Sequence, residues 1–240
     1  MTAETNYLKY KGKMKVADLI DLDYHLLSIL ARLNIKLGFG EMNIEEMCKK
    51  NNLSIDLFLL ICRIYSFPGF TPSLDNMKSG DLRSILSYLH ASHVYYMSIV
   101  LPRLENKLKK MGDSCSEIHK KILSNFYESY YKELNKHFSF EEKIVFRYVE
   151  QLLKHENSEN FNIEKFERHH TDIDEKLSDL KNIIIKYLPE DCPTSLRNEV
   201  LFDLFQFEED LTKHTLIENK LFIPLVAKLE NSDEKVEPKK

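Results

Sequence analysis

The sequence predicts an all-α protein in which a small helical domain precedes an up-down four-helix bundle. Long stretches carry apolar residues at the three- and four-residue spacing of helices. Breaking residues are scarce, with 6 Gly and 7 Pro among 240 residues. The hydrophobic content of 43% is sufficient for a buried core, and the length allows two domains.

The N-terminal domain is predicted over residues 14–66. VADLIDLDYHLLSILARL, IEEMCKKNN and SIDLFLLICRIYS have helical apolar spacing, and Ser54 is a suitable N-cap for the last of them. Gly38 and Gly40 in LGFGEMN predict a turn with unusual backbone angles. Residues 67–81, FPGFTPSLDNMKSGD, have the composition of a linker.

The four-helix bundle is predicted over residues 82–230. Breaks at MGDS, HENSEN and PEDCPTS separate four long periodic segments, which cover residues 82–111, 116–155, 160–188 and 195–230. Four helices with short connections fold most economically as an up-down bundle. The polar tail, residues 231–240, is expected to fray.

Composition and charge limit the classes of function. A net charge of -4 and a pI near 6.2 provide no basic field, so we do not expect nucleic-acid binding. No apolar run approaches the roughly 20 residues that span a bilayer, and the N-terminus lacks the hydrophobic segment of a signal peptide, so we expect a cytoplasmic protein without a membrane partner. The cysteines form no C-x-x-C pair and are expected to be buried, reduced thiols: Cys48, Cys62, Cys115 and Cys192.

A short motif occurs twice in the predicted bundle. HFSFEEKIVF begins at His137 and HTLIENKLFI begins at His214, and each places a Glu four residues after its His, at Glu141 and Glu218. Residues four apart lie on one face of a helix, so each His and Glu can reach a common point. A single such pair is weak evidence in a chain with 9 His and many acids.

A shared spacing strengthens the motif. His93 precedes His137 by 137 − 93 = 44 residues, and His170 precedes His214 by 214 − 170 = 44 residues. The same interval is expected if an ancestral helix pair was duplicated, with one ligand on its first helix and His-x-x-x-Glu on its second. The predicted metal ligands are therefore His93, His137, Glu141, His170, His214 and Glu218.

This donor set favours particular metals. Buried acids and histidines are costly unless they are paired or bound to a cation. Imidazole and carboxylate without thiolate suit iron or manganese, with zinc also open. Because a carboxylate has two oxygens, Glu141 and Glu218 can each bridge two ions while two imidazoles bind each ion, which leaves coordination positions open for a small molecule.

The C-terminal part resembles the haemerythrin-like cation-binding bundle, specifically the di-iron repair-of-iron-centres (RIC) family. The resemblance covers most of residues 82–230 and is carried by SHVYYMSIVLPRL, HFSFEEKIVF, HHTDIDEKL and HTLIENKLFIP. His170 fits the family spacing better than His169. Residues 14–65 are similar to the small domain that precedes the bundle in many members, but Leu37 to Gly40 stand where those members carry Cys-Cys followed by glycines. This difference puts a thiol-dependent role for that domain in doubt.

The resemblance implies a cofactor and a function. It implies two iron ions with carboxylate and oxo bridges, with manganese or zinc less favoured. It also implies a role in nitrosative or oxidative stress, in which the protein assists repair of damaged iron–sulfur clusters. The implied partners are a gas or oxygen-derived ligand at the metals and iron–sulfur proteins.

Several alternatives stay open. One is a di-iron gas or redox sensor that acts through its N-terminal domain on a partner, and another is a metal-free helical interaction module. Redox activity on oxygen, peroxide or nitric oxide and a homodimeric state are also left open. Glu142 and Asn219 follow the two ligand glutamates, and each either orients a ligand histidine or lies on a solvated face. We expect His90 at the surface and His169 beside the site.

Overall fold

The computed structural model describes residues 9–156, 161–167, 173–189 and 192–233. Within these ranges the regular elements are helices, together with an isolated β-bridge between Lys15 and Asn43. The all-α class predicted from the sequence is confirmed. Among the described residues, no helix has the length and apolar character needed to cross a membrane.

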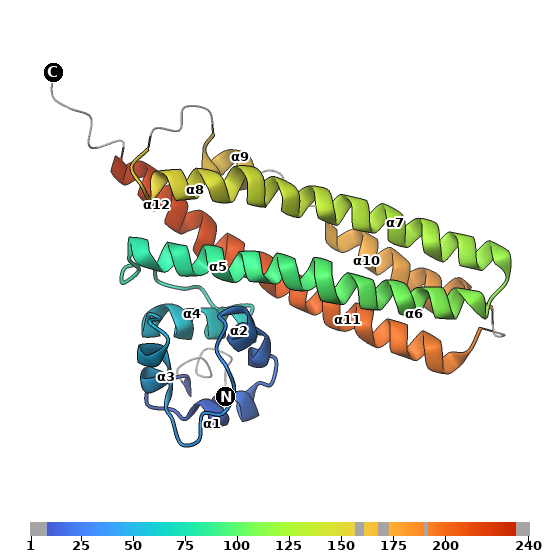
Figure 1. Cartoon of the computed structure of the whole chain (residues 1–240), viewed down its shortest axis with the longest axis horizontal. Helices are drawn as coiled ribbons and strands as arrows, with labels where there is room; N and C mark the ends of the chain where they lie inside the picture. The colour runs from blue at the N-terminus through green and yellow to red at the C-terminus, as the bar shows by residue number, and fades with distance from the viewer. Residues whose placement is uncertain (1–8, 157–160, 168–172, 190–191, 234–240) are drawn as a thin grey trace. The chain divides into compact units, whose positions relative to one another are not determined.

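Four short helices form the N-terminal part: α1 (Val16–Leu22), α2 (Leu26–Arg32), α3 (Ile44–Lys50) and α4 (Ile55–Ser66), shown in blue and teal in Figure 1. As predicted, Ser54 caps α4, because its hydroxyl accepts a hydrogen bond from the Leu57 amide at 3.3 Å. Gly38 and Gly40 have φ values of 103° and 54°, which confirms the predicted turn. The local sequence signals therefore account for how these helices begin and connect.

The chain forms two compact units. The first unit comprises Met1–Ser92, Tyr148–Glu167 and Lys213–Lys240, and the second comprises His93–Arg147 and Arg168–Thr212. In the first unit the N-terminal helices bury Leu19, Leu26, Ile29 and Phe58. The domain limits predicted at residues 67–81 stay a prediction.

The first unit also contains helices that follow the four N-terminal helices along the chain. They are α5 (Ser79–Tyr95) up to Ser92, most of α8 (Arg147–Leu152), α9 (Ile163–Glu167) and α12 (Ile223–Asp233). Glu230 on α12 accepts hydrogen bonds from the Tyr148 hydroxyl at 2.5 Å and from the Ile163 amide at 2.9 Å. One carboxylate therefore holds three separate segments of this unit together.

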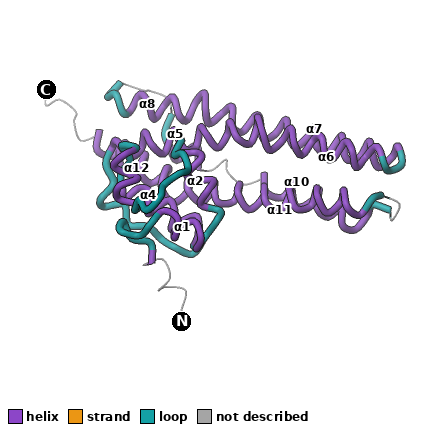
Figure 2. The backbone as a smooth tube through the Cα atoms, turned by 60° about the horizontal axis from the view of Figure 1, so that its bottom comes forward, coloured by secondary structure: helices purple, strands orange, loops and turns teal. Residues whose placement is uncertain are grey.

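The second unit contains the four-helix core. Its long helices are α6 (Leu101–Asp113), α7 (Glu117–Phe140), α10 (Ile173–Asn182) and α11 (Thr194–Ile217) up to Thr212, which lie alongside one another in Figures 1 and 2. Each helix contributes fully buried leucines to one hydrophobic cluster, for example Leu104, Leu123, Leu180 and Leu204. This is the bundle that the four periodic segments predict.

The duplication predicted from the motif spacing is visible in the helices. Both α7 and α11 have 24 residues, and both their first and their last residues are 77 apart, since 194 − 117 = 77 and 217 − 140 = 77. Their buried positions follow the same interval: Leu123 and Val200, Tyr127 and Leu204, Tyr130 and Phe207, Leu134 and Leu211. We call residues 93–146 the first repeat and residues 170–223 the second repeat.

A disulfide corrects one expectation. Cys115 and Cys192 are bonded to each other, with Cα atoms 5.2 Å apart, whereas Cys48 and Cys62 are buried, free thiols as expected. The expectation of reduced thiols is therefore wrong for two of the four cysteines. The bonded pair also lies 77 residues apart, just before α7 and α11. Because these helices run in the same direction (Figure 1), equivalent residues before them meet at one end of the bundle.

Candidate metal centre

The two predicted ligand glutamates occupy equivalent and unusual helix positions. Glu141 begins the π-helical segment η4 (Glu141–Phe146), and Glu218 begins η6 (Glu218–Phe222). Both side chains are 0% exposed. π-Helical turns are rare and occur frequently at functional sites. Each repeat therefore places a buried carboxylate where its helix departs from α geometry.

In the first repeat, Glu141 faces two imidazoles. Its Oε2 lies 3.0 Å from Nε2 of His93, and its Oε1 lies 2.8 Å from Nε2 of His137. His93 comes from α5, whereas His137 is one turn before Glu141 on α7. His93 is buried, and the His137 side chain is 18% exposed. Both histidines predicted for this repeat thus reach the predicted carboxylate.

In the second repeat, His214 and Glu218 form the equivalent pair. Nε2 of His214 lies 3.1 Å from Oε1 of Glu218, and both side chains are buried. His170 and its neighbour His169 lie outside the described residues. The geometry of this repeat is therefore described for two of its three predicted ligands.

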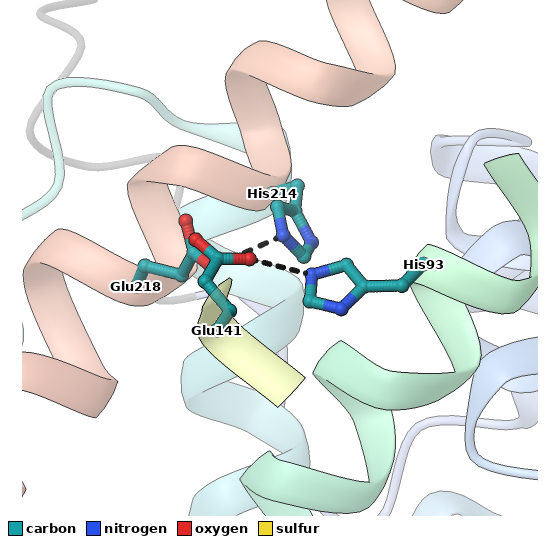
Figure 3. Close-up of side chains that lie close together, drawn as sticks. All are labelled: His93, Glu141, His214 and Glu218. Atoms are coloured by element: carbon teal, nitrogen blue, oxygen red, sulfur yellow. Dashed lines mark ion pairs between the residues drawn. The ribbon is translucent and has the colours of Figure 1, made fainter. Parts of the chain in front are cut away.

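Four of the predicted ligands converge: His93, Glu141, His214 and Glu218. Each offers one nitrogen or oxygen atom, and these atoms all lie within 4.8 Å of one another. Figure 3 shows the two imidazoles and the two carboxylates directed toward one another, with His214 and Glu218 on one continuous helix and His93 and Glu141 on two others. His137 is not among the four but contacts the cluster through Glu141.

The cluster fits a metal ion. An imidazole nitrogen that offers its lone pair repels a carboxylate oxygen at about 3 Å unless a cation lies between them. Burying two carboxylates without compensation is costly, and a bound cation removes that cost. Nitrogen and oxygen donors without sulfur suit iron, manganese or zinc.

Additional side chains orient His93. Its ring stacks on Phe138 and Phe146, with centroid distances of 4.2 Å and 5.5 Å. Its Nδ1 lies 2.7 Å from Oε1 of Glu142. In the tautomer with the proton on Nδ1, His93 donates a hydrogen bond to Glu142 and its Nε2 lone pair is directed at Glu141.

The residues flanking the predicted ligands have different environments. Glu142, for which the sequence leaves two interpretations open, contacts His93, whereas Asn219 is exposed. His90 is exposed, as expected. The Phe138 and Phe146 contacts were not predicted, although both residues lie at helical spacing around Glu142 and could have been considered for that reason.

Comparison with known proteins supports this description. Residues 84–226 match the family model described as the Hemerythrin HHE cation binding domain, which is more than half of the chain. The chain belongs to this family. No significant match was found among curated proteins or solved structures. Family and donor cluster together define a metal-binding helical protein.

Proposed function

We propose that this chain is a di-iron protein of the repair-of-iron-centres kind, which assists the repair of damaged iron–sulfur clusters during nitrosative or oxidative stress. The main support is the pair of fully buried carboxylates, Glu141 and Glu218, in one cluster with two imidazoles. Two carboxylates offer four oxygens, which is enough to bridge two ions. The motifs that resemble this family contain the same residues.

The proposed ligands divide between the repeats. His93, His137 and Glu141 serve the first repeat, and His170, His214 and Glu218 serve the second. Bound iron supplies ferrous–ferric redox change and open coordination positions for oxygen, peroxide or nitric oxide. The protein contributes the fixed imidazole nitrogens, the two carboxylates and an enclosure that keeps bulk water away.

Burial of the centre restricts what can reach it. The four clustered ligands are at most 3% exposed, so a client protein cannot touch them directly. Only a small molecule or an ion can pass between the centre and a partner. This restriction agrees with the gas or oxygen-derived ligand that the resemblance implies. It also allows the repair of a damaged cluster by donation of an iron ion.

Anaerobic purification followed by optical spectroscopy tests this proposal. We expect the iron-loaded protein to change its spectrum on exposure to air and to nitric oxide, and to restore activity to an air-damaged iron–sulfur enzyme. Glu141→Ala combined with Glu218→Ala should abolish both results. The control is His119→Ala, which removes a ring that contacts Ser116 at the start of α7. A spectrum that neither air nor nitric oxide changes would contradict the proposal.

A second candidate, a sensor acting through the N-terminal helices, is favoured by two lysines. Lys220 Nζ donates hydrogen bonds to the carbonyls of Pro68 and Phe70, at 2.5 Å and 2.7 Å. Lys213 Nζ lies 4.5 Å from the ring centroid of Tyr65 on α4. Lys213 is adjacent to His214, and Lys220 is two residues after Glu218. A shift of either proposed ligand would therefore change the contacts that its neighbouring lysine makes with the N-terminal part.

A further inference from the structure

Two phenylalanines are exposed in the middle of α11. Phe202 is 73% exposed and Phe205 is 50% exposed, and both lie in the part of this 24-residue helix that belongs to the second unit. The buried residues of the helix, among them Leu204 and Phe207, face the hydrophobic cluster instead. Single exposed apolar residues are ordinary, but two large rings one helical turn apart form a patch.

The first repeat shows that the fold does not require apolar residues at these positions. In the 77-residue register, Asn125 and Glu128 of α7 are the counterparts of Phe202 and Phe205, and both are exposed. α7 packs into the same hydrophobic cluster with these polar residues on its surface. The phenylalanines are therefore not needed to build the helix or the core, which indicates a contact outside the bundle.

The patch lies within a stripe of exposed residues that has the same pattern in both directions. Its members follow one face of α11 at alternating intervals of three and four residues, with two polar residues on each side of the phenylalanines: Ser195, Asn198, Phe202, Phe205, Glu209 and Thr212. This spacing is the one by which a helix packs along another helix. A symmetrical pattern suits a two-fold contact, in which the same surface of two molecules meets itself.

We propose that α11 pairs with α11 of a second copy of this chain in antiparallel orientation. A two-fold axis between Phe202 and Phe205 places Phe202 of each copy against Phe205 of the other. It also places Asn198 opposite Glu209 of the other copy, and an amide donates hydrogen bonds to a carboxylate. A parallel pair would instead bring Glu209 next to its own equivalent, which like charges disfavour. This inference does not depend on the metal centre.

The exposed area favours a reversible dimer. Lys181 on α10 holds Phe205 in place, because its Nζ lies 4.6 Å from the ring centroid, so little side-chain freedom is lost on pairing. The four rings of two copies supply roughly 500 Å² of buried surface. Stable complexes bury at least about 1,200 Å² in total, so the polar ends of the stripe must pair as well. We therefore expect a dimer that dissociates on dilution.

Sedimentation velocity on the full chain tests the inference. With rising protein concentration, the mass should increase from 28.4 kDa towards twice that value. Phe202→Asn combined with Phe205→Glu introduces the side chains that α7 carries at the equivalent positions, so this variant should fold and remain monomeric. Ile118→Ser is the matched control, because Ile118 is 72% exposed on α7 and its counterpart is Ser195. The control should dimerise like the wild type.

Crosslinking tests the orientation. Asn198→Cys and Glu209→Cys are prepared as separate variants and mixed under mild oxidation. In the antiparallel pair, the new thiols of the two variants face each other. Two copies of Asn198→Cys instead keep their thiols roughly 16 Å apart along the helix axis, which is beyond the reach of a disulfide. The mixture should therefore form a covalent dimer faster than either variant alone.

Each outcome decides the inference. If circular dichroism shows that the double phenylalanine variant does not fold, Phe202→Ala replaces it and should raise the dissociation constant of the dimer at least about 10-fold. A wild type that stays monomeric at every concentration, or a dimer that the phenylalanine replacements leave unchanged, would overturn the inference. Equally fast crosslinking of Asn198→Cys alone would overturn the antiparallel orientation. None of these measurements involves iron, so the proposed function is tested separately.

Discussion

The disulfide between Cys115 and Cys192 joins equivalent residues of the duplicated helix pairs, 77 positions apart in the chain. It lies just before α7, and His137 is the twenty-first residue of that helix. At 1.5 Å per residue, about 30 Å of helix separates the disulfide from His137, the first proposed metal ligand on this helix. The cross-link therefore acts on the stability of the bundle without touching the centre.

Removing this cross-link should destabilise the fold and leave metal binding unchanged. For a loop of this length, chain entropy predicts a loss of about 4.5 kcal/mol in the free energy of unfolding for Cys115→Ser with Cys192→Ser. Urea unfolding with and without reductant measures the loss. Reductant should have no effect on the double variant. Equal stability of oxidised and reduced wild type would refute this prediction.

The two free thiols should be inert in the native protein. Burial raises the pKa of Cys48 from 9.0 to about 12, and burial also raises the pKa of Cys62 well above its usual value. The thiolate is the reactive form, so iodoacetamide at pH 8 should modify both residues only after unfolding. Mass spectrometry of native and denatured samples measures this, and rapid labelling of the native chain would argue against it.

The same pKa shifts predict how stability depends on pH. Above pH 9.0 the unfolded thiols ionise while the folded Cys48 stays protonated, up to about pH 12. The stabilisation that the buried, protonated thiols give to the folded state is therefore fully present below pH 9.0. As pH rises above 9.0, the free energy of unfolding falls by up to about 1.4 kcal/mol per pH unit for each thiol. Cys48→Ala should reduce this slope in denaturant titrations between pH 9 and 11. An unchanged slope would mean that Cys48 is not the group responsible.

Metal removal should lower the stability of the protein. Metal that binds only the folded state adds about 2.7 kcal/mol per site at roughly 100 times its dissociation constant. Chelated and iron-loaded samples should therefore differ in urea midpoint, and the variant lacking both Glu141 and Glu218 should show no such difference. Identical midpoints for loaded and chelated wild type would be incompatible with tight binding at this cluster.

Lys220 provides a test of the sensing alternative. Lys220→Met removes the donor to the carbonyls of Pro68 and Phe70, so the segment around them should be cleaved faster in limited proteolysis. Lys143→Met is a matched control, because Lys143 is the exposed, equivalent residue of the first repeat. If the centre signals through this contact, metal should slow cleavage of the wild type but not of Lys220→Met. Metal-independent cleavage of the wild type would exclude signalling by this route.

Much of the fold could be predicted from the sequence because its signals are local. Apolar spacing places the long helices, and the cap at Ser54 and the turn at Gly38 depend on neighbouring residues. The spacing of 44 residues carries long-range information because a duplication repeats contacts as well as residues. For that reason the amino-acid sequence alone predicts that Glu141 and Glu218 lie in one site.

Other features depend on packing that local patterns do not encode. Glu142 is on the same helix as several acids, and only the approach of α5 brings its carboxylate to His93. Cys115 and Cys192 meet because two helices begin at the same end of the bundle. Comparing residues 77 apart could have identified that pair, since the cysteines keep the register of the ligands.

Counting iron in the anaerobically reconstituted full chain tests the central claim most directly. The account predicts two iron ions per wild-type chain and loss of the dinuclear centre when Glu141 and Glu218 are both replaced by alanine. An iron content near zero in the folded wild type, or one that the double replacement leaves unchanged, would contradict it.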